Sequence, residues 1–265
     1  MTSVLSKFRS IKNILSHPIV ILERQIEYGN LIFGFEQRNR YQLSDPNGNP
    51  LGYLLERERS LGQIMLRQVT KLHRPFVVDF YDNENNFLFK LQRNFSFINS
   101  RVKVWNEIGD NNILPEDYLV GTSVQNWHLW RRKYDLFAQE AMANSMEEQD
   151  KPHELSQFGY IDAPFLSYDF PVKDENDKII GSVDRNWVGL GREMFTDTGV
   201  YVIRFDSQQS FKGVYDQSML SRQILNLNQR AVLLSNAISI DFDYFSRHSR
   251  DVSNGGLFSL GGDYE

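Results

Sequence analysis

One late stretch of the chain, residues 227–245, has hydrophobic positions that recur with the period of an α-helix. At about 100° per residue, one stripe of this helix consists of Leu227, Ala231, Leu234, Ile238, Phe242 and Phe245. A second stripe lies beside it, and together they cover roughly 200° of the circumference, which is wider than on a surface helix. The pattern predicts a helix enclosed either by the rest of the protein or by a membrane.

The charge-free run in this helix, residues 231–240, decides between the two surroundings. It is ten residues long and contains two serines and an asparagine, whereas a membrane span needs about 20 apolar residues. Arg230, Asp241 and Asp243 flank it, and each charge would cost about 2.5–3.5 kcal/mol near a bilayer centre. We therefore expect a core helix, and a membrane-inserting C-terminal helix is the alternative.

Three earlier segments share another pattern: a short alternating strand, a polar turn, and a second strand. These segments are residues 41–53, 77–89 and 168–181. Asp45, Asp82 and Asp174 open the three turns, and Asn or Gly follows within each, as tight hairpins require. The aspartates would be metal ligands in a functional interpretation, but turn hydrogen bonding explains them better.

A second repeat suggests duplication of β-structure. Residues 121–127 (GTSVQNW) match residues 181–187 (GSVDRNW) at the Gly, Asn and Trp positions. The chain therefore divides into two β-rich halves, about 30–137 and 158–206, which precede the helix. We expect a mainly β fold, a closed barrel around the helix, because closure removes exposed strand edges.

The remaining segments have no strand pattern. Residues 1–18 carry cations but no acid, and place Leu5, Phe8, Ile11 and Leu15 on one helical face. This N-terminal leader resembles a weak mitochondrial presequence or an amphipathic surface helix, and a frayed helix is the alternative. Within a main domain over 19–248, residues 139–157 are expected to form a surface insertion, and 249–265 a flexible tail.

Composition limits the chemistry. With 265 residues and no cysteine, thiolate catalysis, disulfides and Cys-based zinc sites are excluded. The net charge of −5 carries no global basic signature, so nucleic acid is not an expected partner. The five histidines have no metal-binding spacing, and no nucleophile or nucleotide motif is present. The chain is therefore not expected to be an enzyme.

One short segment combines aromatic and basic residues. Its members are Trp127, Trp130, Arg131, Arg132 and Lys133. Two indoles beside three cations suit contact with anionic lipid head groups at a membrane interface. The alternative is that Trp127 packs into the barrel beside a solvated basic turn.

Several motifs resemble the phospholipid scramblase family. They are residues 25–27, 34–36 and 39–41 near the start, residues 186–197 (NWVGLGREMFTD), and residues 240–242 in the late helix. The resemblance extends from about Ile19 to His248, and fungal members with a mitochondrial leader are the most similar. It implies a tubby-like barrel of about twelve strands around the C-terminal helix.

The resemblance also implies a function and a location. The expected function is ATP-independent movement of phospholipids between leaflets, or lipid handling at a membrane; the alternative is a soluble tubby-like module that binds anionic head groups without scrambling. Phospholipid membranes, with anionic lipids preferred, are the expected partners. The expected location is intracellular and membrane-associated, at the mitochondrion or, alternatively, at the cytoplasmic face of the plasma membrane.

The chain departs from the family at the calcium segment. The weak candidate ligands are Asp197, Thr198 and Asp206. Gly199 and Val200 stand where further oxygen ligands are expected, and Arg204 adds a repelling charge. Because calcium takes six to eight oxygen ligands, calcium is a doubtful cofactor for this chain. The family's closing helix is often described as a membrane anchor, and here it carries charges that need partners if the helix is buried.

Overall fold

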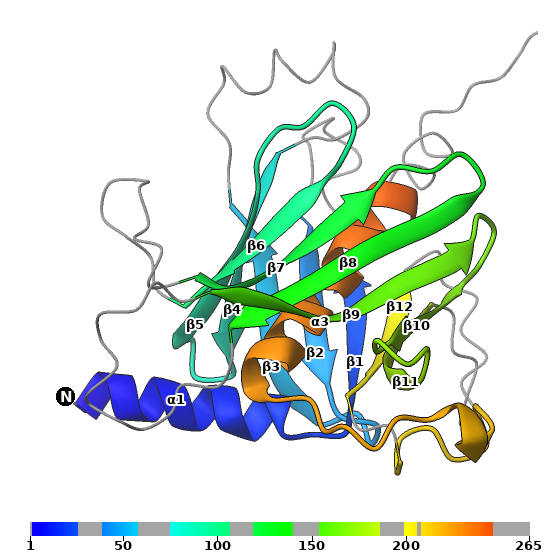
Figure 1. The fold of residues 1–265 in the computed structure, drawn as a ribbon. Coiled ribbons are helices and arrows are strands. Elements are labelled where there is room, and N and C mark those ends of the chain that lie inside the picture. The colour runs from blue at the N-terminus through cyan, green and yellow to red at the C-terminus, as the bar shows by residue number, and fades with distance from the viewer. Residues whose placement is uncertain are drawn as a thin grey trace, which may run out of the picture.

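The computed structural model describes residues 2–25, 39–57, 75–106, 119–139, 154–185, 199–205 and 208–245, with side chains from Arg9 onward. Its described strands form one closed antiparallel barrel, in which each strand pairs with its neighbours in sequence and β1 closes on β12 (Figure 1). The strands are β1 (Ile19–Gln25), β2 (Arg40–Ser44), β3 (Pro50–Glu56), β4 (Phe76–Asp82), β5 (Phe87–Arg93), β6 (Arg101–Trp105), β7 (Leu119–Asn126), β8 (Arg131–Gln139), β9 (Leu155–Pro164), β10 (Asp169–Lys173), β11 (Ile179–Arg185) and β12 (Val200–Arg204). The prediction of a mainly β closed barrel is confirmed.

The late hydrophobic stretch forms α3 (Leu227–Ile240), which continues as a π-helical turn, η4 (Asp241–Phe245). Figure 1 shows this helix running through the barrel, and every residue from Arg230 to Ile240 is buried. A capping box starts it: the Asn226 side chain accepts from the Gln229 N–H, and the Gln229 side chain accepts from the Asn226 N–H. The core-helix prediction is confirmed. Among the described residues, no helix combines the length and the apolar character that crossing a bilayer requires.

The matching glycines of the sequence repeat, Gly121 on β7 and Gly181 on β11, lie where the barrel wall comes close to α3. A Cβ at Gly121 would stand 2.5 Å from Val232 Cγ2 and 2.4 Å from the Phe137 carbonyl oxygen. A Cβ at Gly181 would stand 2.8 Å from Leu233 Cδ2. Both are closer than real Cβ atoms come to other atoms. The repeat therefore reflects a shared packing role at the helix.

The three predicted hairpin turns share one geometry. Asp45 Oδ1 accepts the backbone N–H groups of the residues two and four positions later, at 2.9 and 2.8 Å. Asp82 and Asp174 accept the equivalent pairs of N–H groups. The residue three positions after each aspartate has a positive φ; these residues are Gly48, Asn85 and Asp177. The interpretation of these aspartates as turn residues is confirmed.

A short N-terminal helix, α1 (Thr2–Leu15), lies across the end of the barrel where α3 begins (Figure 1). Ile14 and Leu15 belong to the hydrophobic core. The buried Arg230 guanidinium donates to the Leu15 carbonyl oxygen at 2.8 Å, which ties α1 to α3. Most of the predicted insertion (140–153) and the whole predicted tail (249–265) lie outside the described residues, and Gln139 and residues 155–157 belong to β8 and β9.

Candidate functional site

Large hydrophobic side chains are exposed at the barrel end opposite α1. Three neighbouring loops, 94–100, 127–130 and 165–168, project there, and we call this the loop end (Figure 1). Among the described residues, nine exposed large hydrophobic side chains belong to it: Phe95, Phe97, Ile98, Trp127, Leu129, Trp130, Phe165, Leu166 and Tyr168. Phe97, Leu166 and Trp130 are 80%, 79% and 72% exposed. Such a contiguous apolar surface is typical of a membrane or protein contact.

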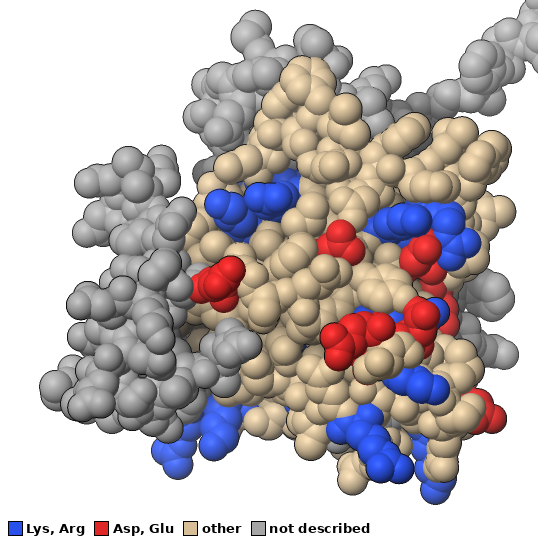
Figure 2. Space-filling model, viewed as in Figure 1, with Lys and Arg blue, Asp and Glu red and all other residues tan. Residues whose placement is uncertain are grey.

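Figure 2 shows the same face in space-filling form. The projecting tips at the upper right carry no charged side chains, and below them Lys and Arg lie together with Asp and Glu. An apolar tip above a band that contains cations is compatible with the order of acyl chains and phosphates in a bilayer surface.

The structure separates the five residues predicted to contact head groups. Trp127 and Trp130 are exposed at the loop end, as such contact requires. Arg131 and Lys133 point outward and both form ion pairs with Asp162. Arg132 lies between them on the strand, so its side chain points the other way and is only 6% exposed. The alternative in which Trp127 packs into the barrel does not describe this structure.

Beneath the loop end, the C-terminal end of the central helix carries two buried carboxylates. Asp241 accepts hydrogen bonds from the hydroxyls of Tyr41 and Tyr201, each at 2.6 Å. Arg24 Nη1 lies 3.7 Å from the same carboxylate. These contacts supply the partners that a charge on a buried helix needs.

Asp243 lies two residues beyond Asp241 and has a similar environment. Its carboxylate pairs with Arg93 Nη1 at 2.5 Å and accepts from the Tyr134 hydroxyl at 2.8 Å. Ser239 Oγ lies 3.1 Å away. Burial raises the pKa of Tyr134 well above its ordinary value, and the negative charge of Asp243 raises it further. Sequence analysis identified the helix charges but not Arg93 or Tyr134 as their partners, because these two residues come from distant strands.

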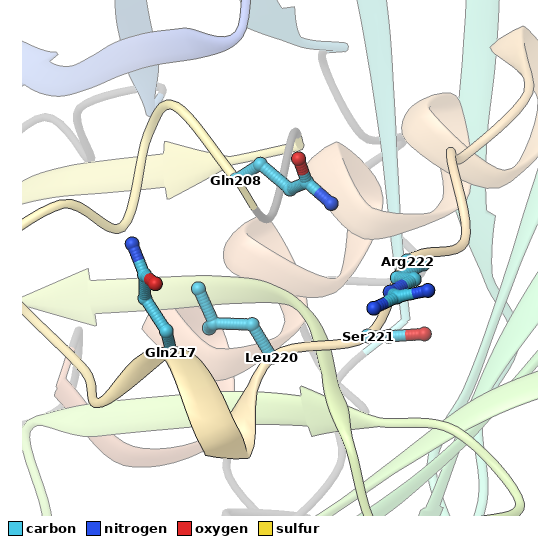
Figure 3. Close-up of a pocket in the computed structure, with 5 residues that line it drawn as sticks. All are labelled: Gln208, Gln217, Leu220, Ser221 and Arg222. Atoms are coloured by element: carbon cyan, nitrogen blue, oxygen red, sulfur yellow. The ribbon is translucent and has the colours of Figure 1, made fainter.

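A small cavity of about 290 Å³ lies at the opposite end, near the start of α3 (Figure 3). Its lining comprises Gln208, Gln217, Leu220, Ser221 and Arg222. Among the described residues, this lining has no acid or histidine beside the Ser221 hydroxyl.

Metal binding was predicted as weak at best. The candidate calcium ligands Asp197, Thr198 and Asp206 lie outside the described residues. Within the part of the chain that the structure describes, no group of three or more His, Asp or Glu side chains is arranged to hold a metal ion.

Comparisons with known proteins support the lipid interpretation. The sequence profile of the Scramblase family matches residues 2–247. The chain is 53% identical over 262 residues to Altered inheritance rate of mitochondria protein 25 of Saccharomyces cerevisiae. This alignment covers 95% of this chain and 77% of that protein. It is 39% identical to a phospholipid scramblase family protein of Schizosaccharomyces pombe, over 88% of this chain and 61% of that one. Phospholipid scramblase 2 of Bos taurus is 23% identical over 85% of this chain and 68% of its own length.

Proposed function

Because the chain belongs to the scramblase family, we propose that it attaches to an intracellular membrane through its loop end and moves phospholipids between leaflets there without ATP. The observation that carries this proposal is the cluster of nine exposed hydrophobic side chains on three adjacent loops. Transfer of one such side chain out of water contributes about 1.5–3 kcal/mol. Insertion of three of them contributes about 4.5–9 kcal/mol, the range in which a single acyl chain gives reversible membrane binding.

The enclosed position of α3 supports attachment by loops. The residues from Arg230 to Ile240 are buried by the barrel wall, and the helix end is joined to four strands through Asp241 and Asp243. Withdrawing the helix would break these bonds and expose the core. The exposed loops make membrane contact without that cost.

We place the protein at a mitochondrial membrane. The name of the Saccharomyces cerevisiae relative refers to the inheritance of mitochondria, and that relative is 53% identical to this chain. Fractionation of cells that express the tagged chain tests this location: the protein should sediment with mitochondrial membranes and be released by detergent. Recovery with plasma membrane would contradict it.

Leaflet exchange is tested with vesicles that contain a fluorescent phospholipid quenchable from outside. Addition of the purified full chain should raise the quenched fraction from about half toward completion, both with calcium and with a calcium chelator. A variant in which Trp127, Trp130 and Leu166 are serine should lose this effect. Exchange no faster than in protein-free vesicles, in both buffers, would refute lipid movement.

A second candidate is a tubby-like module that binds anionic lipid surfaces without moving lipids. The buried helix favours it, because the hydrophobic residues of α3 are enclosed by the barrel and are not presented to a bilayer. Flotation separates the two functions: a protein that floats with anionic vesicles but leaves the quenched fraction at half is such a module.

A further inference from the structure

Arg132, at the start of β8, has an environment unlike that of the other buried arginines that the structure describes. Its guanidinium lies among aromatic rings, with Cζ 4.1 Å from the centre of the Tyr244 ring and 5.0 Å from that of Phe245. Its one side-chain hydrogen bond within the described residues, from Nη1 to the Ser167 carbonyl oxygen, is long at 3.3 Å. Its buried Nε–H has no partner among the described residues.

The other buried arginines have acids or carbonyl oxygens as partners. Arg93 pairs with Asp243, and Arg204 pairs with Asp184. Arg230 donates to the carbonyl oxygens of two neighbouring segments at 2.8 and 2.9 Å. An uncompensated buried charge costs several kcal/mol. The barrel supplies a carboxylate or short bonds to carbonyl oxygens at these arginines, whereas Arg132 has aromatic rings and one long bond to a carbonyl oxygen.

A second cation lies beside it. Arg185, at the end of β11, has its Cζ 4.0 Å from the centre of the same Phe245 ring and 5.7 Å from that of Tyr168. Its Nε is also buried without a hydrogen-bond partner in the described part of the chain. Burial lowers the pKa of Arg132, and the positive charge of Arg185 lowers it further. Neither guanidinium loses its proton in proteins, so the pair retains two positive charges that need an anion.

We propose that Arg132 and Arg185 bind the phosphate group of an anionic lipid, such as the phosphomonoester of phosphatidic acid, at the loop end. Guanidinium groups donate two parallel hydrogen bonds to phosphate, and rings such as Phe245 hold their planes in place. The unpartnered Nε–H groups supply donors for this purpose. The inference rests on the proposed membrane attachment, since attachment brings head groups to this position.

The surroundings favour a lipid over a soluble anion. Loop 165–168 covers the site: Phe165 lies 5.3 Å from Arg132 Cζ, and the next residue, Leu166, is 79% exposed. When Leu166 enters the acyl region, the guanidinium pair lies at the depth of the phosphates. Arg185 is half-buried, so it contacts the phosphate before Arg132 does. The phosphate then replaces the Ser167 carbonyl oxygen as the acceptor of the long hydrogen bond from Arg132.

The test compares flotation of the full chain with vesicles of phosphatidylcholine alone and with vesicles that also contain phosphatidic acid. The wild-type protein should bind both and prefer the second. Arg185→Gln should reduce this preference about tenfold, the effect of losing one charge-assisted hydrogen bond, and leave binding to phosphatidylcholine unchanged. Arg222→Gln at the opposite end is the matched control and should keep the preference.

The two proposals fail in different ways. If the wild-type protein floats with neither vesicle, membrane attachment itself is wrong. If it floats with both equally, or if Arg185→Gln keeps the full preference, only the phosphate site is wrong.

A stability measurement distinguishes a binding residue from a structural one. A buried charge without a partner is replaced by an apolar side chain with little loss or a gain of stability. Arg132→Met should therefore melt at or above the wild-type temperature and still lose the preference for phosphatidic acid. A large drop in melting temperature, with the preference retained, would overturn the assignment.

Inorganic phosphate identifies the source of the ligand. Release of wild-type protein from phosphatidic acid vesicles by millimolar phosphate, but not by chloride of equal ionic strength, supports recognition of the phosphate group itself. Retention under both salts, together with the Arg185→Gln effect, supports a site that takes phosphate only from the lipid surface. Equal release by both salts would contradict a specific site.

Discussion

The hydroxyl of Tyr41 on β2 donates a hydrogen bond to the Asp241 carboxylate at the C-terminal end of the central helix, with 2.6 Å between Oη and Oδ2. These residues are 200 positions apart in the sequence. Tyr201 donates to the other oxygen of the same carboxylate, also at 2.6 Å. One helix residue therefore joins the two strands that flank β1, where the barrel closes.

Removal of this carboxylate should destabilise the fold strongly. Asp241→Ala leaves two buried hydroxyls and the Arg24 cation without their acceptor, which we expect to cost about 3–5 kcal/mol in the free energy of unfolding. Urea denaturation measures this change. Asp162→Ala, which removes a partly exposed ion pair with Arg131, is the control and should cost about 1 kcal/mol or less. Equal losses would show that the buried network is not important for stability.

Stability should fall at alkaline pH. Burial raises the pKa of Tyr41, Tyr134 and Tyr201 well above the ordinary value of about 10, and the neighbouring Asp241 or Asp243 raises it further. Because the folded pKa exceeds the unfolded pKa, this contribution is complete below pH 10 and is lost as pH rises toward the folded pKa.

Absorbance at 295 nm during an alkaline titration, followed together with circular dichroism, measures the effect. These tyrosines should ionise only as the barrel unfolds. The double variant Tyr41→Phe and Tyr201→Phe should show a weaker dependence of stability on alkaline pH. Complete tyrosine ionisation with native circular dichroism would disprove the burial argument.

Substitution of the wall glycines should weaken packing of the helix. Gly121→Ala places a methyl group against a backbone carbonyl oxygen as well as Val232, and overpacking of this kind costs about 1–3 kcal/mol or more. Gly181→Ala should cost less, because its closest neighbour is the end of the Leu233 side chain. Thermal unfolding of both variants shows which substitution lowers stability more. Greater loss at Gly181 would contradict the contact geometry.

The exposed tryptophans should matter for membrane binding but not for folding. Trp127→Ser combined with Trp130→Ser removes apolar surface worth about 1.5–3 kcal/mol for each residue, so vesicle affinity should fall at least tenfold with an unchanged melting temperature. Ile224→Ser is the control, because Ile224 is 75% exposed in the segment that leads into α3. Equal losses in both variants would show that exposed hydrophobicity, wherever it lies, drives binding.

The N-terminal helix should contribute to stability through its buried end. Leu15→Ala removes a fully buried core side chain and should cost about 2–5 kcal/mol. Asn13→Ala, on the exposed side of the same helix, should have little effect in the same denaturation assay. A negligible effect of Leu15→Ala would mean that the helix is not an integral part of the barrel.

Local patterns were enough to predict much of this fold. The central helix follows from a 3.6-residue period, and the hairpins follow from aspartates that accept hydrogen bonds only two and four residues away. The N-terminal helix was predicted as a leader, but its sequence gives no sign that Leu15 accepts a bond from Arg230, 215 residues later.

The basic segment shows where sequence reasoning reached its limit. Arg131, Arg132 and Lys133 were treated as one basic segment with a common role, yet all three lie in strand β8, which begins at Arg131. Alternation along the strand turns Arg132 inward and leaves its neighbours outside. The strand boundary and its register decide this, and they depend on pairing with β7 and β9.

The sequence by itself determined the enclosed helix, the turn chemistry and the family, because each rests on residues close together in the chain or on motifs compared one by one. Only the tertiary structure decided which residues meet: Tyr41 with Asp241, Arg93 with Asp243, and Arg132 with Arg185 around Phe245. The physical reason is barrel closure, which brings side chains from distant strands onto one end of one helix and leaves three apolar loops exposed above it.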